Sequence, residues 1–126
     1  LIINILTQTN NPELLSHFYK INKNPYPSLA EIMETNFNAK LSLSQFARMT
    51  SRSLSTFRRD FLKIYNISPG EWLREKRLQL SCHLLKTTSR NIDDIAYECG
   101  FSSRTHFIRC FRQRFGPTPH QFRQER

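Results

Sequence analysis

The sequence predicts an all-α fold in which two helix-turn-helix units are joined by a long linker helix, with about seven helices in total. The chain has only three glycines in 126 residues, and no long stretch alternates apolar and polar residues as a half-buried strand does. The pattern of residues 43–69 recurs in residues 92–119. Repetition of one short helical pattern indicates two copies of a supersecondary unit.

The helices of the first unit are predicted from residues that favour a helix N-terminus and from apolar residues at helical spacing. Their starts are expected at Ser28 (with Glu31 completing a capping box), at Ser42 or Ser44, and at Ser53. Their inward-facing residues are expected to be Leu29, Ile32, Met33 and Phe37, then Phe46, Ala47 and Met49, then Phe57, Phe61 and Ile64.

The longest helix is expected to start at Ser68-Pro69 and to run to about Thr87, since Ser suits the N-cap and Pro suits the first helical position. Three helices follow it and form the second unit, which the long helix joins to the first. They are expected over Ile92–Cys99 behind an Asn91 cap, from Ser102 or Ser103 to near Gly116, and from Thr118-Pro119 onward.

The two copies match in spacing as well as in pattern. Ala47 corresponds to Ala96 at an offset of 49, and the offset after the turn is 50. The matched aromatic positions are Phe57 with Phe107, Phe61 with Phe111, Tyr65 with Phe115, and Trp72 with Phe122. These aromatic residues are expected to form the core of each unit rather than stacking platforms for bases.

The turns differ between the copies. Gly100 permits a left-handed turn, and Phe101 fills the space between the helices. The first copy has Ser51 and Arg52 at these positions. Because Ser51 tolerates a left-handed conformation less easily than glycine, the geometry of the first turn is expected to be less secure. Arg52 is expected at the surface, where it can contact phosphate.

The chain carries 19 Lys and Arg against 10 Asp and Glu, a net charge of +9. Residues 1–40 hold three of each sign, so the whole excess falls in residues 41–126. Such a field favours polyanions, either nucleic acid or an anionic membrane surface. No apolar run is long enough to span a membrane and no signal peptide is apparent, so a cytoplasmic location without membrane contact is expected.

The remaining chemistry-bearing residues give little support for an enzyme. Three cysteines without CxxC spacing (Cys82, Cys99 and Cys110) are expected to be reduced core residues, with redox sensing by Cys99 or Cys110 as the alternative. The four histidines lack Cys or carboxylate partners at metal spacing. We therefore expect no cofactor, no metal and no catalytic residue.

The outward faces of the third and sixth predicted helices carry polar and basic residues opposite the aromatic ones. On the third they are Ser55, Arg59, Leu62 and Lys63, with Arg58 at the flank. On the sixth they are Thr105, Arg109, Arg112 and Gln113, with Ile108 at the flank and Arg104 in the first turn. An exposed arginine can bond guanine in the major groove, and Ser, Thr or Ile can meet other base edges.

The second copy closely resembles the signature of the AraC/XylS family of bacterial transcription regulators. The matching residues are Ile95-Ala96, Gly100-Phe101-Ser102, Phe107, Arg109, Phe111, Phe115-Gly116, Thr118-Pro119 and Phe122-Arg123, with Arg77-Leu78 and Leu84-Leu85 fitting the family's linker helix. The resemblance covers about Leu29 to Arg123 and is weaker in the first copy. It implies base-reading roles for Ser55, Arg58, Arg59, Thr105, Ile108 and Arg109.

Further expectations follow from the same resemblance and from the charge. The partner is expected to be double-stranded DNA, with phosphate contacts from Arg52, Lys63, Arg104, His106 and Arg112. The resemblance also implies an activator that contacts RNA polymerase. Residues 22–27 contain two Asn and two Pro and predict a linker. The chain is therefore divided into residues 1–26, a linker or upstream tail, and residues 27–126, the DNA-binding domain.

Three points qualify this interpretation of function. Residues 1–26 are too few for the sensor domain that family members often carry, so that domain is expected to be absent from this chain. An architectural or nonspecific nucleic-acid-binding protein would show the same charge, and would bind scrambled DNA equally well. A protein-interaction or dimerisation module would bind DNA with weak salt dependence.

Overall fold

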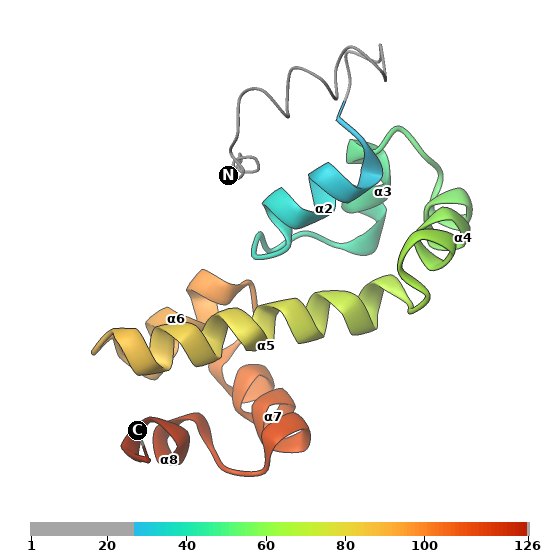
Figure 1. Ribbon diagram of the computed structural model, residues 1–126. Helices are drawn as coiled ribbons and strands as arrows, with labels where there is room; N and C mark the ends of the chain where they lie inside the picture. The colour runs from blue at the N-terminus through green and yellow to red at the C-terminus, as the bar shows by residue number, and fades with distance from the viewer. Residues whose placement is uncertain (1–26, 126) are drawn as a thin grey trace, which may run out of the picture. The chain divides into compact units, whose positions relative to one another are not determined.

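The computed structural model describes residues 27–125, which form seven helices and no strand (Figure 1). The helices are α2 (Leu29–Asn36), α3 (Leu43–Met49), α4 (Leu54–Tyr65), α5 (Pro69–Thr87), α6 (Ile92–Cys99), α7 (Arg104–Phe115) and α8 (Pro119–Gln124). The all-α prediction is confirmed for this part of the chain. The linker or tail predicted for residues 1–26 lies outside the described residues.

Contacts divide the chain into two compact parts, residues 1–35 and residues 36–126. Most of α2 belongs to the first part, and α3 to α8, including both turns, belong to the second. In α2, Ser28 and Glu31 form the predicted capping box: each backbone N–H donates to the other's side-chain oxygen, at 2.7 and 3.1 Å. This pairing satisfies two N–H groups that the helix itself leaves without partners.

Each helix from α3 to α8 starts at a side-chain cap. In every case the oxygen of the cap accepts a hydrogen bond from the backbone N–H three residues later. The caps are Ser42, Ser53, Ser68, Asn91, Ser103 and Thr118. Of the alternatives left open by the sequence, the structure selects Ser42 and Ser103. A cap of this kind contributes about 1 kcal/mol, so these residues fix where each helix begins.

The aromatic repeat is reproduced in three dimensions. Four fully buried phenylalanines form the inner faces of α4 and α7: Phe57, Phe61, Phe107 and Phe111. The ring of Phe61 meets Trp72 edge-on at 5.6 Å between centroids. The ring of Phe111 meets Phe122 edge-on at 5.4 Å. The predicted correspondence between Trp72 and Phe122 is therefore confirmed, because α4 and α7 each pack edge-on against a further aromatic ring.

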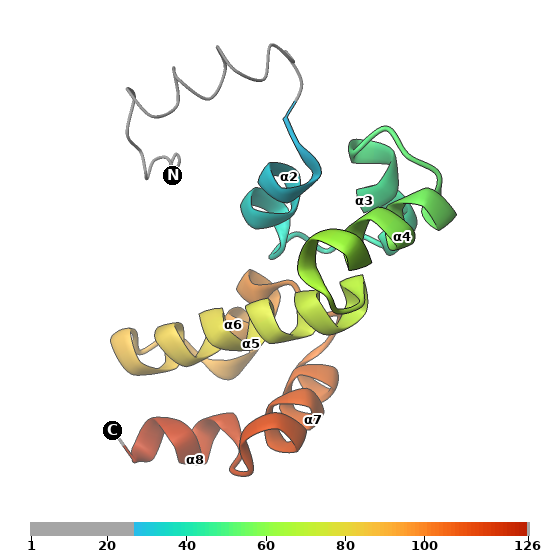
Figure 2. The ribbon, with the colours of Figure 1, turned by 45° about the vertical axis from the view of Figure 1, so that its right-hand side comes forward.

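The long helix α5 supplies core residues to both helix-turn-helix units (Figures 1 and 2). Near its start, Trp72 packs on the aromatic rings of α4. Further along, Leu78 and Leu85 join the buried core formed with α6 and α7. The last carbonyls of α5 are held by Arg123 of α8, whose guanidinium donates to the carbonyl oxygens of Leu85 and Thr88, both at 3.2 Å.

The two turns share one backbone geometry, contrary to the expectation for the first. Ser51 adopts φ 58° and Gly100 adopts φ 95°, both in the left-handed region. In each turn the backbone N–H of the following residue donates to the carbonyl oxygen of an alanine. Arg52 donates to Ala47 at 2.9 Å, and Phe101 donates to Ala96 at 3.0 Å. The first turn thus forms without glycine, at the cost of placing a side chain in that region.

Two residues expected in the core are exposed. Met49 is 42% exposed and Ile64 is 50% exposed. At the end of α4 the aromatic packing is continued instead by Tyr65, whose ring centroid lies 4.5 Å from that of Phe61. The prediction of inward-facing Met49 and Ile64 is therefore wrong.

The close packing around Gly100 gives a test of the second turn. A Cβ atom at Gly100 would lie 2.8 Å from the carbonyl oxygen of Asn38, and the positive φ adds strain. Gly100→Ala is expected to lower the free energy of unfolding in urea by about 2 kcal/mol or more. The control is Gly70→Ala in α5, where nothing lies within 4 Å of the added atom. That change should raise stability by roughly 0.5–1 kcal/mol, and equal effects of the two would contradict this view of the turn.

Candidate nucleic-acid interface

The outward face of α4 is polar and basic, as predicted. Ser55, Arg58, Arg59 and Lys63 are all exposed, opposite the buried Phe57 and Phe61. The helix packs through its aromatic face, so this opposite side is available to a partner. Leu62 is also exposed, at 53%, beside these residues.

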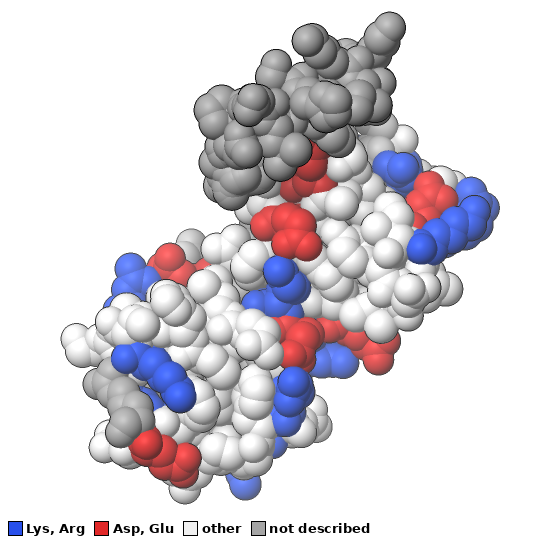
Figure 3. Space-filling model, in the orientation of Figure 1, with Lys and Arg blue, Asp and Glu red and all other residues white. Residues whose placement is uncertain are grey.

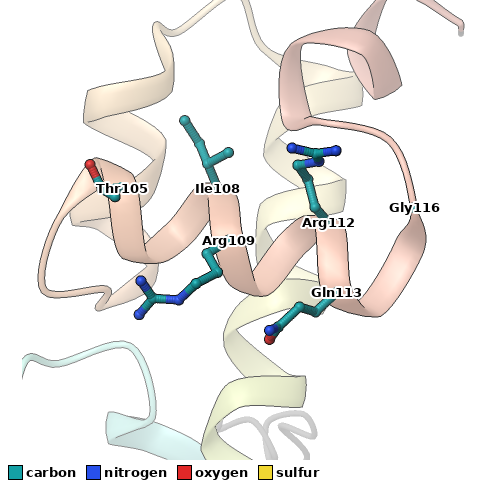
Figure 4. Close-up of a pocket in the computed structure, with 6 residues that line it drawn as sticks. All are labelled: Thr105, Ile108, Arg109, Arg112, Gln113 and Gly116. Atoms are coloured by element: carbon teal, nitrogen blue, oxygen red, sulfur yellow. The ribbon is translucent and has the colours of Figure 1, made fainter.

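The outward face of α7 forms a shallow, open hollow of about 520 Å³. It is lined by Thr105, Ile108, Arg109, Arg112, Gln113 and Gly116 (Figure 4). In Figure 4, Ile108 and Arg112 project to one side of the helix, and Arg109 and Gln113 to the other. Three predicted base-reading residues and one predicted phosphate-binding residue therefore come together on one surface. Gln113, which sequence analysis placed outward without a role, belongs to the same surface.

Basic side chains on this domain are separated by acidic ones that bind some of them. On the face that Figure 3 shows, basic and acidic side chains are interspersed rather than gathered into patches of one sign. Arg114 of α7 donates from Nε and Nη2 to the carboxylate of Glu75 in α5, at 2.8 and 3.1 Å. Arg104 lies 3.8 Å from Asp93, with both side chains more than half exposed. Neither of these ion pairs involves Arg58, Arg109 or Arg112, which leaves these three guanidinium groups more available.

Arg52 does not project from the surface. Its Nε donates to Asp60 at 2.8 Å and its Nη1 donates to the carbonyl oxygen of Thr50 at 3.0 Å. About 30% of its side chain is exposed. The expectation that Arg52 lies free at the surface is therefore wrong, because its guanidinium bonds the first turn to α4, whereas its contact with phosphate stays a prediction. Sequence analysis did not single out Asp60, which is the residue that binds the Arg52 guanidinium.

His106 is also more enclosed than expected. Its ring meets Phe101 edge-on at 5.7 Å between centroids, and its Nδ1 lies 3.3 Å from the Ser102 hydroxyl. Partial burial lowers the pKa of His106, and the positive charge of Arg109 lowers it further. His106 is thus partly buried. The phosphate contact expected of it stays a prediction, and an uncharged imidazole is a weaker ligand for phosphate than a charged one.

The described residues offer no alternative chemical site. Cys82, Cys99 and Cys110 are free thiols, as predicted, and the last two are buried. Burial raises the pKa of Cys99 to about 12, which disfavours the reactive thiolate. Within residues 27–125 there is no cluster of metal-ligating side chains. No helix in that range is long and apolar enough to cross a membrane.

Comparisons with known proteins agree with this geometry. A family model described as a helix-turn-helix domain matches residues 46–125. The virulence regulon transcriptional activator VirF of Yersinia enterocolitica is 39% identical over 109 residues, which are 86% of this chain and 40% of VirF. The chain thus spans about 40% of the length of that relative.

Solved structures show the same fold. The DNA-binding domain of AdpA, a global transcriptional factor crystallised with a target DNA, aligns with a TM-score of 0.72 at 27% identity, covering 77% of this chain and 90% of that one. An AraC-type transcriptional regulator from Chromobacterium violaceum aligns with a TM-score of 0.65 at 31% identity, covering 77% and 89% respectively.

The ion pair between α5 and α7 gives a pH test. Hydrogen bonds from Arg114 and Gln79 hold the pKa of Glu75 below its usual value of 4.5. A lowered carboxyl pKa stabilises the fold above the unfolded-state pKa, and that stability is lost as pH falls through the folded-state value. Glu75→Gln should therefore lower the melting temperature above about pH 5, and the difference from wild type should shrink as the pH falls below the usual value of 4.5. A difference that grows on acidification would refute this assignment.

Proposed function

This chain belongs to the AraC/XylS family of bacterial transcription regulators, and on that premise we propose that it is a sequence-specific DNA-binding domain. In this proposal α4 and α7 enter adjacent major grooves of one duplex. The observation that carries it is the repeat: two recognition helices have buried aromatic faces and outward faces rich in exposed arginine. The DNA complex of AdpA supports the same assignment by likeness of fold.

Base reading is assigned to the outward residues of both helices. On α7, Arg109 lines the hollow and projects from the helix on the side opposite Ile108 (Figure 4). Its guanidinium has the donors that guanine O6 and N7 accept in the major groove, and Ile108 suits a thymine methyl. On α4 the corresponding readers are Arg58 and Arg59, which are exposed. Ser55 and Thr105 provide hydroxyls near the starts of the two helices.

Phosphate binding is assigned to the remaining exposed cations. Lys63 follows the readers on α4, and Arg104 and Arg112 flank those on α7. The domain would be drawn to DNA by its net charge of +9 and then held in register by these contacts. Arg52 is less available for this role, because Asp60 binds it.

The length of α5 suits two readers on one DNA face. Its 19 residues span about 28 Å at 1.5 Å per residue, whereas successive major grooves on one face lie about 34 Å apart. The length of α5 is of the order of this spacing, but α7 meets α5 near its start, at Glu75, so that length is not itself the separation of α4 and α7. The DNA would bend to bring both grooves to the two helices.

For the whole regulator we propose activation of transcription through contact with RNA polymerase in the cytoplasm. The name of VirF as a transcriptional activator supports this direction of regulation. Any sensor domain would lie in the part of the relatives that this chain does not span. A nonspecific binder is distinguished from this function by competition with scrambled DNA, which would displace the preferred duplex just as well.

Binding to duplex DNA should depend strongly on salt. If about six phosphates are neutralised, log K should fall against log[salt] with a slope near −5. Fluorescence anisotropy of a labelled duplex between roughly 50 and 300 mM salt measures this slope. A slope shallower than about −2 would exclude the groove-bound arrangement in favour of a module that meets DNA incidentally.

Arg109→Ala should weaken binding to the preferred duplex by about 1–3 kcal/mol and remove the preference at one base pair. Arg114→Ala is the matched control, because it removes the same charge from the same helix but its guanidinium is bound by Glu75. The control should leave base preference unchanged. Equal losses for Arg109→Ala on all duplexes would reassign Arg109 to phosphate contact.

A further inference from the structure

Asp60 on α4 lies between two arginines of the first unit. Its Oδ2 accepts a hydrogen bond from Arg52 Nε at 2.8 Å, and its Oδ1 lies 3.9 Å from Arg59 Nε. About 27% of the Asp60 side chain is exposed, against 64% for Arg59. One carboxylate therefore joins the turn between α3 and α4 to an exposed arginine on the outward face of α4.

The second unit has no equivalent of this arrangement. At the positions that correspond to Arg52 and Asp60 it carries Phe101 and Cys110, both buried in the apolar core. Within residues 27–125, Arg109, the counterpart of Arg59, forms no ion pair with a carboxylate. The two units thus close their turns in different ways, one by an ion pair and the other by apolar packing.

A carboxylate on a helix that binds DNA repels phosphate, so its presence there calls for a compensating role. Pairing with Arg52 accounts for only one of its two oxygens. The contact with Arg59 involves Nε, so the terminal Nη1 and Nη2 groups are not taken up by this pair. Those two groups form the fork that bonds two acceptors on one base edge.

We propose that Asp60 is a positioning residue that orients Arg59 for base recognition, using Arg52 as its anchor. The inference rests on the proposed function of α4 as a reader. It makes the two recognition helices unequal: Arg59 is pre-oriented by a neighbouring carboxylate, whereas Arg109 is not. Pre-orientation reduces the side-chain entropy lost on binding, so it favours the correct base over others.

The positive charges around Asp60 keep its carboxyl group ionised, as the contact with Arg59 requires. The hydrogen bond from Arg52 lowers the pKa of Asp60, and the positive charges of Arg52, Arg59 and Lys63 lower it further. The carboxylate is therefore ionised throughout the neutral range. No protonation step is needed for the contact with Arg59.

The test is a double-mutant cycle on the discrimination ratio, defined as affinity for the selected duplex divided by affinity for scrambled DNA. Asp60→Asn removes the charge but keeps an amide oxygen that accepts from Arg52. It is measured alone, with Arg59→Ala, and with Arg109→Ala. Thermal unfolding of each variant shows whether the fold persists, and Arg52→Phe with Asp60→Cys, which copies the second unit, provides a variant with an apolar turn.

Asp60→Asn should reduce the discrimination ratio by about threefold or more, while binding to scrambled DNA stays equal or strengthens. The reduction should disappear in the Arg59→Ala background and persist in the Arg109→Ala background. The copied turn should fold and show the same reduced ratio as Asp60→Asn. These results together support the proposal.

Three results would overturn it. An equal gain in affinity for both duplexes would leave Asp60 with only a charge effect. Equal losses on both duplexes with a lower melting temperature would make Asp60 only structural. An undiminished effect in the Arg59→Ala background would show that it does not act through Arg59. If wild-type protein itself shows no preference among duplexes, the proposed function fails first, and this inference fails with it.

Discussion

Burial of the aromatic faces of α4 and α7 is the constraint on which the rest of this domain depends. Each recognition helix presents two fully buried phenylalanines to the core, and each is closed by a third ring, Trp72 for α4 and Phe122 for α7. Fixing one face in this way fixes the opposite one. The exposed arginines are therefore oriented by packing on the far side of the helix, and the same long helix α5 serves both units.

The turns show that one backbone geometry can be supported by different chemistry. In the second unit Gly100 adopts the left-handed conformation without a side chain to strain it, and Phe101 fills the core. In the first, Ser51 accepts the same left-handed conformation, and an ion pair from Arg52 to α4 replaces the apolar plug. A partly exposed ion pair contributes little to stability compared with a buried ring. The first unit is thus closed by a polar contact that extends to its DNA-facing side.

Sequence reasoning predicted the fold well, because caps, proline and the aromatic repeat act locally and leave clear patterns. The prediction of buried residues failed where a helix was analysed without comparison with the matching helix of the other unit. Helical spacing alone placed Ile64 in the core, yet its match in the repeat is Arg114, an exposed residue. The partner of Arg52 was missed because an ion pair across eight residues has no periodic signature. Two departures in the same unit, Arg52 for Phe101 and Asp60 for Cys110, carried that signal.

The central claim is that α4 and α7 each read their own stretch of one duplex. Selection of binding sites from a random DNA pool tests it most directly, performed in parallel on wild type, Arg59→Ala and Arg109→Ala. Wild type should select two blocks of preferred bases about 10 base pairs apart. Each variant should lose a different block and retain the other. A single block in wild type, or loss of the same block by both variants, would contradict the account.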